Sequence, residues 1–154
     1  MENIQNEMKK LFGGSCYGYC LAYLFIKDSK NIKALTQAFM QGWVDGFIDD
    51  DGFVSNPLGF IHSMVGKVIF KDVEKVAINS MYDIPKEPTI CEMRQPNGKD
   101  SHFIVCHFDG EKVVLDFDPS GISNSWKLGR FISYRKYITN NNRRINNAKY
   151  GKNI

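Results

Sequence analysis

The chain has 154 residues, of which 43% are hydrophobic, 13% aromatic and 24% charged. This length fits one domain, and this composition excludes wholesale disorder. No apolar run approaches the roughly 18 residues that a membrane-spanning helix needs. The stretch from Met1 to Lys10 also lacks the apolar core of a signal peptide. We therefore expect a soluble, cytoplasmic protein without membrane contact.

Positive charge gathers at the C-terminal end, where residues 127–154 hold eight of the 20 Lys and Arg and no Asp or Glu. A basic end is one signature of nucleic-acid binding. This one carries no known recognition motif and little aromatic interleaving, so we favour a solvated, partly disordered end. We expect one domain over residues 1–138 and a basic Asn/Arg-rich tail over 139–154. The residues that nucleic acid would use are Arg130, Arg135, Lys136, Arg143 and Arg144.

The four cysteines are Cys16, Cys20, Cys91 and Cys106. Disulfides would need an oxidising compartment, to which no export signal points. Cys16 and Cys20 have a spacing found in some zinc sites, but Cys91 and Cys106 form no second close pair. We therefore expect no metal and no cofactor.

The first half of the chain reads as helical. Nearly every residue from Cys16 to Ile26 is apolar or aromatic, and a helix that is apolar all round is a buried central helix. A second helix is expected over Ile32 to Trp43, where apolar residues recur three and four apart. A third short helix is expected over Pro57 to Val65.

The second half reads as strands. Strands are expected over Thr89–Met93, His102–Phe108 and Lys112–Phe117, and Asp109-Gly110 between the last two is a strong hairpin signal. Helices followed by antiparallel strands indicate an α+β domain.

Cys16 is the most informative residue, because it begins the predicted buried helix directly after Gly13-Gly14-Ser15. The positive end of a helix dipole favours a thiolate, which is the nucleophilic form of cysteine. Packing as a small apolar residue is an equally good reading of Cys16 by itself. Cys20 lies one turn deeper, and we expect it to be buried and inert.

A nucleophilic cysteine needs a base, usually histidine, and a third group that orients the imidazole. Of the three histidines, His62 falls in a predicted helix and His107 lies near the hairpin turn, where it should be exposed. His102 opens a strand and could face a cleft, although a structural role is commoner for such a histidine. Asp116 and Asp118 are the carboxylates that could hold its ring.

Two segments resemble a known family. Ser15–Leu24 resembles the cysteine helix of papain-like peptidases, in particular of bacteriocin-processing (double-glycine) peptidases. Ser101–Val105 and Asp116–Pro119 resemble the histidine strand and the terminal Asp-Pro of that group. The chain also looks like a family of short uncharacterised bacterial and prophage proteins that has no established activity.

The resemblance implies a papain-like fold, with the cysteine at the start of a buried helix packed on a small antiparallel sheet. It also implies Cys16 as nucleophile, His102 as general base and Asp118 as orienting acid, acting on a peptide or protein substrate. By the same resemblance, Trp126 is a candidate to shield the triad.

Two features depart from the family pattern. Lys10 stands where papain-like enzymes place the Gln that completes the oxyanion hole, and the loss of one such donor can cost about 10²–10³ in rate. A strict two-residue Asp109-Gly110 turn would also point Asp118 and Asp116 away from His102. We therefore predict a one-residue bulge, or a three-residue loop that includes Glu111, either of which would restore Asp118 to the side of His102. Asp118 stays ahead of Asp116.

The predicted function is that of a cysteine peptidase or amidase with a Cys-His-Asp triad. The main alternative is a papain-like binding module without turnover, which the substitution at Lys10 favours. A nucleic-acid-associated protein that uses the basic end is a lesser alternative.

Overall fold

The computed structural model describes residues 16–94, 101–120 and 129–139, and the account below concerns these residues. Three helices come first: α2 over Cys16–Phe25, α3 over Ile32–Val44 and α4 over Pro57–Val65. All three predicted helices are confirmed, with boundaries that differ by no more than one residue. None of the helices in these ranges is long and apolar enough to cross a membrane.

Side-chain caps set where two of these helices begin. The Asn31 side chain accepts hydrogen bonds from the backbone N–H groups of Lys33 (2.9 Å) and Ala34 (3.3 Å). Asn56 caps α4 in the same way through the N–H of Gly59 at 3.0 Å. These bonds satisfy backbone donors that have no partner inside a helix, which stabilises each start by about 1 kcal/mol.

Five strands then form one antiparallel sheet in the order β1-β5-β2-β3-β4. The α+β prediction is confirmed. The sequence patterns missed β1 and β5, and they also missed the short 3-10 helix Met81–Asp83. The strands are β1 Phe70–Ala77, β2 Thr89–Arg94, β3 Ser101–Phe108, β4 Val113–Phe117 and β5 Arg130–Thr139.

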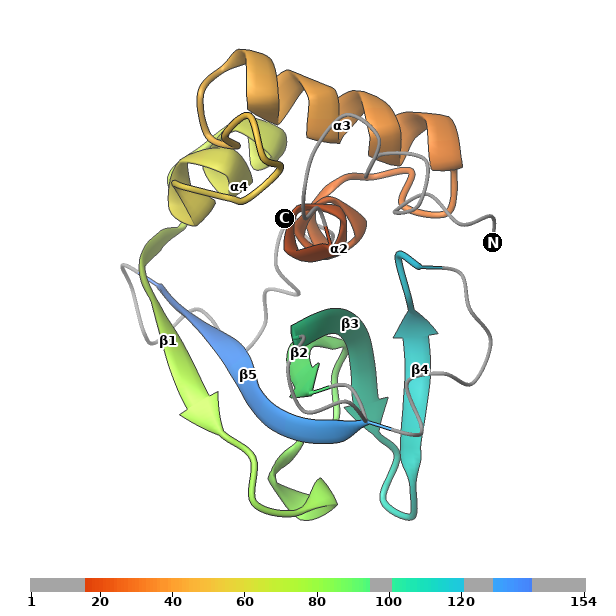
Figure 1. Cartoon of the computed structure of the whole chain (residues 1–154). Helices are drawn as coiled ribbons and strands as arrows, with labels where there is room; N and C mark the ends of the chain where they lie inside the picture. Colours follow the sequence, from red (N-terminus) through yellow and green to blue (C-terminus); the bar gives the residue numbers. More distant parts are fainter. Residues whose placement is uncertain (1–15, 95–100, 121–128, 140–154) are drawn as a thin grey trace.

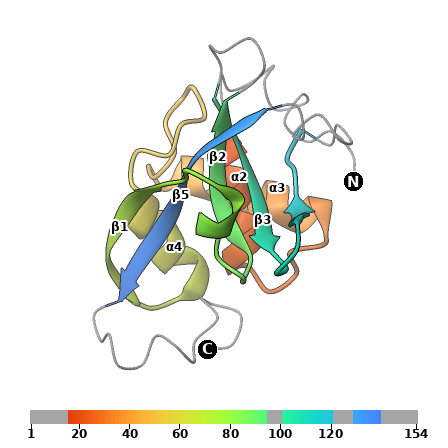
Figure 2. The same ribbon diagram turned by 90° about the horizontal axis from the view of Figure 1, so that it is seen from below.

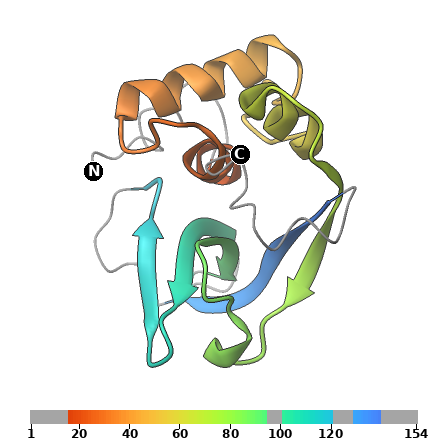
Figure 3. The same cartoon turned by 180° about the vertical axis from the view of Figure 1, so that it is seen from behind.

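Helix α2 lies at the centre of the molecule, between the other two helices and the sheet (Figure 1). Seen from below, β2 and β3 pass across α2, while α4 lies behind β1 and β5 (Figure 2). From behind, β4 and β1 form the two edges of the sheet (Figure 3). Because α2 has neighbours on all sides, the prediction of a buried central helix is confirmed.

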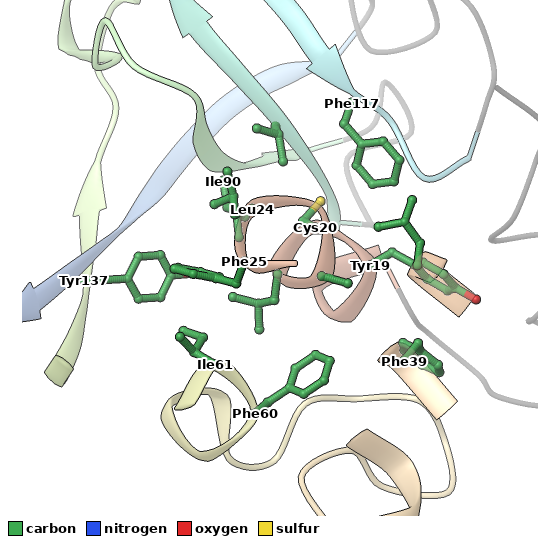
Figure 4. Close-up of a cluster of buried hydrophobic side chains, with 14 of the residues drawn as sticks. Tyr19, Cys20, Leu24, Phe25, Phe39, Phe60, Ile61, Ile90, Phe117 and Tyr137 are labelled. Atoms are coloured by element: carbon green, nitrogen blue, oxygen red, sulfur yellow. The ribbon is translucent and has the colours of Figure 1, made fainter. Parts of the chain in front are cut away.

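The main hydrophobic core surrounds α2 (Figure 4). Cys20 and Leu24 lie on the side of the helix that faces Ile90, while Phe39 and Phe60 lie on its other side. A second cluster of buried side chains comprises Ile78, Ile84, Cys91, Met93, Ile104, Cys106 and Phe108. Since Cys91 and Ile104 alternate along their strands with Ile90 and Val105 of the main core, strands β2 and β3 are buried on both faces.

Part of the basic C-terminal end is a strand inside the sheet: β5 covers Arg130–Thr139, of which only Thr139 falls in the predicted tail 139–154. Only Arg130 and Lys136 are exposed among the basic residues of β5. Arg135 is half-buried, and its Nη2 lies 3.5 Å from Oε1 of Glu92 on β2. Arg143, Arg144 and the rest of the predicted tail from residue 140 lie outside the described residues.

Candidate active site

Cys16 occupies the first position of α2, and its thiol is half-buried. The first N–H groups of a helix have no partner within it and carry the positive end of the helix dipole. A thiolate at this position therefore lies in a favourable field. The predicted neighbours Lys10 and Gly13-Gly14-Ser15 lie outside the described residues, as does Trp126.

His102 is the second residue of β3, and its side chain is only 7% exposed. Its Nε2 lies 2.7 Å from Oδ1 of Asp118, whose side chain is 4% exposed. Asp118 follows the last residue of β4 directly. Two residues sixteen positions apart thus meet in a buried, charge-assisted hydrogen bond.

A bulge in the β3–β4 hairpin makes this contact possible. The hairpin begins with Phe108 opposite Val113, so four residues connect the strands where Asp-Gly alone would leave two. Continued without a break, that pairing would put Asp118 on the opposite side of the sheet from His102. The register instead shifts by one residue at Asp116, because Cys106 pairs with Leu115 while Val105 pairs with Phe117. The predicted one-residue bulge is confirmed. The connection itself has four residues, so the alternative of a three-residue loop is wrong.

The Cys16 side chain lies near enough to the His102 ring to raise its pKa. Asp118 occupies Nε2, so Nδ1 is the ring nitrogen that remains for another partner. Burial by itself lowers the pKa of His102, but the hydrogen bond to Asp118 and the neighbouring Cys16 outweigh it and raise the pKa to about 9. The imidazole is therefore positively charged at neutral pH.

Asp118 is held by a residue that the sequence patterns did not single out. Ser120 donates its backbone N–H (2.9 Å) and its hydroxyl (2.7 Å) to Oδ1, the oxygen that His102 also contacts. Burial raises the pKa of Asp118, yet the bonds from His102 and Ser120 bring it below the usual 3.8. The signal in the sequence is Asp-Pro-Ser, because Asp often accepts hydrogen bonds from the residue two positions on.

The other carboxylate, Asp116, serves a different histidine. Its Oδ2 lies 2.8 Å from Nδ1 of His107, and the side chains are 17% and 25% exposed respectively. The expectation that His107 is simply exposed is therefore wrong. Asp116 is the extra residue of the bulge, so its side chain does not share the side of the sheet on which Asp118 meets His102.

Cys20 is fully buried as predicted. Burial raises the pKa of its thiol well above 9, and the nearby Cys16 and Asp118 raise it further. A thiol in this state is inert. All four cysteines are free, and within residues 16–94, 101–120 and 129–139 no three His, Cys, Asp or Glu side chains gather to hold a metal ion.

Aromatic side chains adjoin the Cys16–His102 pair. Tyr17, which follows Cys16, packs on Phe103, which follows His102, with ring centroids 5.0 Å apart. The Arg135 guanidinium lies 5.1 Å from the Phe103 centroid, and its Nη1 donates to Ser133 at 2.8 Å. These contacts connect α2, β3 and β5 beside the site, and the sequence patterns gave no sign of them.

Comparisons with known proteins give no relative: no protein-family model, no curated protein and no solved structure matches the chain. Its function is therefore argued from the chemistry of the site.

Proposed function

We propose that this chain is a papain-like thiol hydrolase that cleaves peptide or other amide bonds of a peptide or protein substrate, with Cys16 as nucleophile. The observation that supports the proposal most is the arrangement around His102, whose Nε2 lies 2.7 Å from Oδ1 of Asp118 and whose charged form is favoured by both Asp118 and the nearby Cys16. This matches the general pattern of an activated nucleophile, its base and an orienting third group. The resemblance of Ser15–Leu24 and Ser101–Val105 to papain-like peptidases supports the same assignment.

The proposed reaction has two steps. In the first, the Cys16 thiolate attacks the substrate carbonyl carbon, an S–C bond forms, and the C–N bond breaks as His102 gives its Nδ1 proton to the leaving amine. In the second, His102 takes a proton from water, the hydroxide attacks the thioester carbon, and the Cys16 thiolate leaves. Asp118 stays ionised throughout and stabilises the imidazolium. Backbone N–H groups at the start of α2 favour the negative charge that develops on the carbonyl oxygen.

The test is the pH dependence of Cys16 alkylation by iodoacetamide, with the modified residue identified by peptide mass. An ordinary thiol with a pKa of about 8.5 is only about 1% thiolate at pH 6.5. If the His102 imidazolium holds a thiolate at Cys16, the wild type reacts at pH 6.5 and His102→Ala reacts on the order of tenfold more slowly or worse. The midpoint of the profile should then rise toward that of an ordinary thiol.

His107→Ala is the matched control, because it removes the other His–Asp pair on the same strand. It should leave the alkylation profile of Cys16 unchanged. A profile with a midpoint near 8.5 in the wild type, unmoved by His102→Ala, would overturn the enzyme assignment in favour of a binding module. If the thiolate is found, internally quenched peptides and mass detection of an acyl-enzyme separate hydrolysis from acyl transfer to another amine.

A further inference from the structure

Ser120 lies in the turn after β4 and is 9% exposed. Its N–H and its hydroxyl both reach Oδ1 of Asp118, so together with His102 three donors converge on one oxygen. The other oxygen, Oδ2, is buried and accepts no hydrogen bond within the described part of the chain. A buried carboxylate with all of its donors on one side has one preferred rotation about its χ2 angle.

This asymmetry bears on the histidine. Asp118 lies just beyond the end of β4, where no ladder of backbone hydrogen bonds fixes its position. The bonds from Ser120 hold Oδ1 in place opposite Nε2 of His102. They also withdraw electron density from Oδ1, which keeps the carboxylate ionised beside the imidazolium.

We propose that Ser120 is a positioning residue of the thiol site: its hydroxyl fixes the Asp118 carboxylate and, through it, the His102 ring that faces Cys16. This inference rests on the proposed function, and it adds a fourth residue to the three that the family resemblance implies. Its chemical role is to hold the imidazole that acts with Cys16, without contact to the substrate.

The chain offers a close control for this role. Ser133 is also a buried serine, and its hydroxyl also donates to a buried carboxylate, that of Glu92 at 2.8 Å. Its hydroxyl contacts Glu92 and Arg135, outside the His102–Asp118 pair. Ser133→Ala therefore removes the same kind of bond, and any general loss of stability should be similar in the two variants.

The experiment measures Cys16 alkylation against pH in the full chain for Ser120→Ala, Ser120→Thr, Ser133→Ala, His102→Ala and Asp118→Asn, with the melting temperature of each. We expect Ser120→Ala to lower the rate at pH 6.5 by about threefold to tenfold, which is the effect of losing one ordinary hydrogen bond. The pH midpoint of Cys16 alkylation should also rise in Ser120→Ala, by less than it rises in Asp118→Asn. Ser120→Thr retains the hydroxyl and should recover most of the rate, and Ser133→Ala should match the wild type.

A second measurement covers the case in which Thr does not fit at this buried position. In protein with ¹³C-labelled histidine, the NMR titration midpoint of His102 should be lower in Ser120→Ala than in the wild type and unchanged in Ser133→Ala. If Ser120→Ala matches Ser133→Ala in both measurements while His102→Ala and Asp118→Asn change the profile, the role of Ser120 is overturned and the proposed function stands. If none of the variants changes the profile, both fail together.

Discussion

At the scale of single residues, the site depends on which partner each of the two ring nitrogens of His102 has. The Asp118 carboxylate at 2.7 Å from Nε2 and the nearby Cys16 side chain both favour the charged ring. A neutral imidazole has only one N–H group, so it could donate a hydrogen bond to only one of these two partners. The charge on His102 is therefore a part of the folded structure and contributes to its stability.

The titration of His102 tests this statement. In the NMR spectrum of ¹³C-histidine-labelled protein, the three histidines give three titration curves, and we expect the one from His102 to have its midpoint at about 9. In Asp118→Asn the midpoint should fall toward the usual 6.5, because the charge that holds the proton is gone. A wild-type midpoint at or below 6.5 would contradict the proposed charge state.

The same shift fixes how stability depends on pH. Because the pKa of His102 is higher in the folded chain than the unfolded value of 6.5, its contribution is complete below pH 6.5 and is lost as the pH rises through about 9. We expect the wild type to exceed Asp118→Asn in free energy of unfolding by up to about 3 kcal/mol at pH 6. Urea denaturation at pH 6 and pH 10 measures the difference, which should shrink at the higher pH.

At the scale of elements, α2 and α3 can pack as closely as they do because Gly18 of α2 has no side chain. A Cβ atom on Gly18 would lie 2.7 Å from Cε2 of Phe39, which is closer than carbon atoms approach one another. Gly18 thus lets the buried Phe39 ring of α3 pack directly on the backbone of α2. Cys16 stands two residues before Gly18 in the same helix. The packing of Gly18 on Phe39 therefore also helps to fix the position of Cys16.

Gly18→Ala should lower the free energy of unfolding by about 1–3 kcal/mol, the usual cost of overpacking a core. Phe39→Leu removes the ring that would clash, at a cost of its own. The double variant Gly18→Ala/Phe39→Leu should therefore be more stable than the sum of the two single effects predicts. Simple additivity in urea denaturation would show that the clash is not the cause.

The elements that were predicted and those that were missed differ in a physical respect. The three helices and strands β2 and β3 have one or both faces buried, so their apolar residues recur with a clear period. Edge strand β4 was found through the Asp109-Gly110 hairpin signal. Strand β1 is an edge strand with Phe70 as its one buried residue, and charged residues such as Lys71 and Glu74 fill it. Strand β5 mixes Arg and Lys with aromatic residues, so its sequence was interpreted as part of the basic C-terminal end and not as a strand.

The candidate site could be predicted only in part for a similar reason. Cys16, His102 and Asp118 were chosen from local context and from a resemblance, and the structure brings them together. The choice between Asp118 and Asp116 depends on turn length and on a bulge, which residue types alone do not determine. Ser120 was missed because its role depends on a contact that is visible only once Asp118 has been placed.

At the scale of the whole molecule, the sheet is completed by β5, the last strand in the part of the chain that the structure describes. Strand β5 lies between β1 and β2, so it pairs with a neighbour on each side. Since β1 and β5 are far apart in sequence, the sheet depends on non-local contacts, which are slow to form. Tyr134 in β5 stands opposite both Val76 and Cys91.

Proline substitutions test this arrangement. Tyr134→Pro removes a backbone donor in an interior strand, and its loss of stability should be a large part of a folding free energy of about 5–15 kcal/mol. Lys71→Pro is the matched control, because Lys71 is the exposed residue at a register shift in edge strand β1 and has no partner residue in β5. Thermal melts should show a far larger loss for Tyr134→Pro, and equal losses would contradict the role given to β5.

The bulge at Asp116 has a consequence for how this hairpin can change in evolution. Loop tips usually accept insertions and deletions, and the connection over residues 109–112 lies outside the paired strands, so a longer connection leaves the pairing intact. Between Val113 and Asp118 the situation is different, because one residue gained or lost there reverses the side on which Asp118 emerges. A length change in this short stretch would remove the acid from His102 as effectively as a substitution of Asp118, although every residue of the triad would still be present in the sequence.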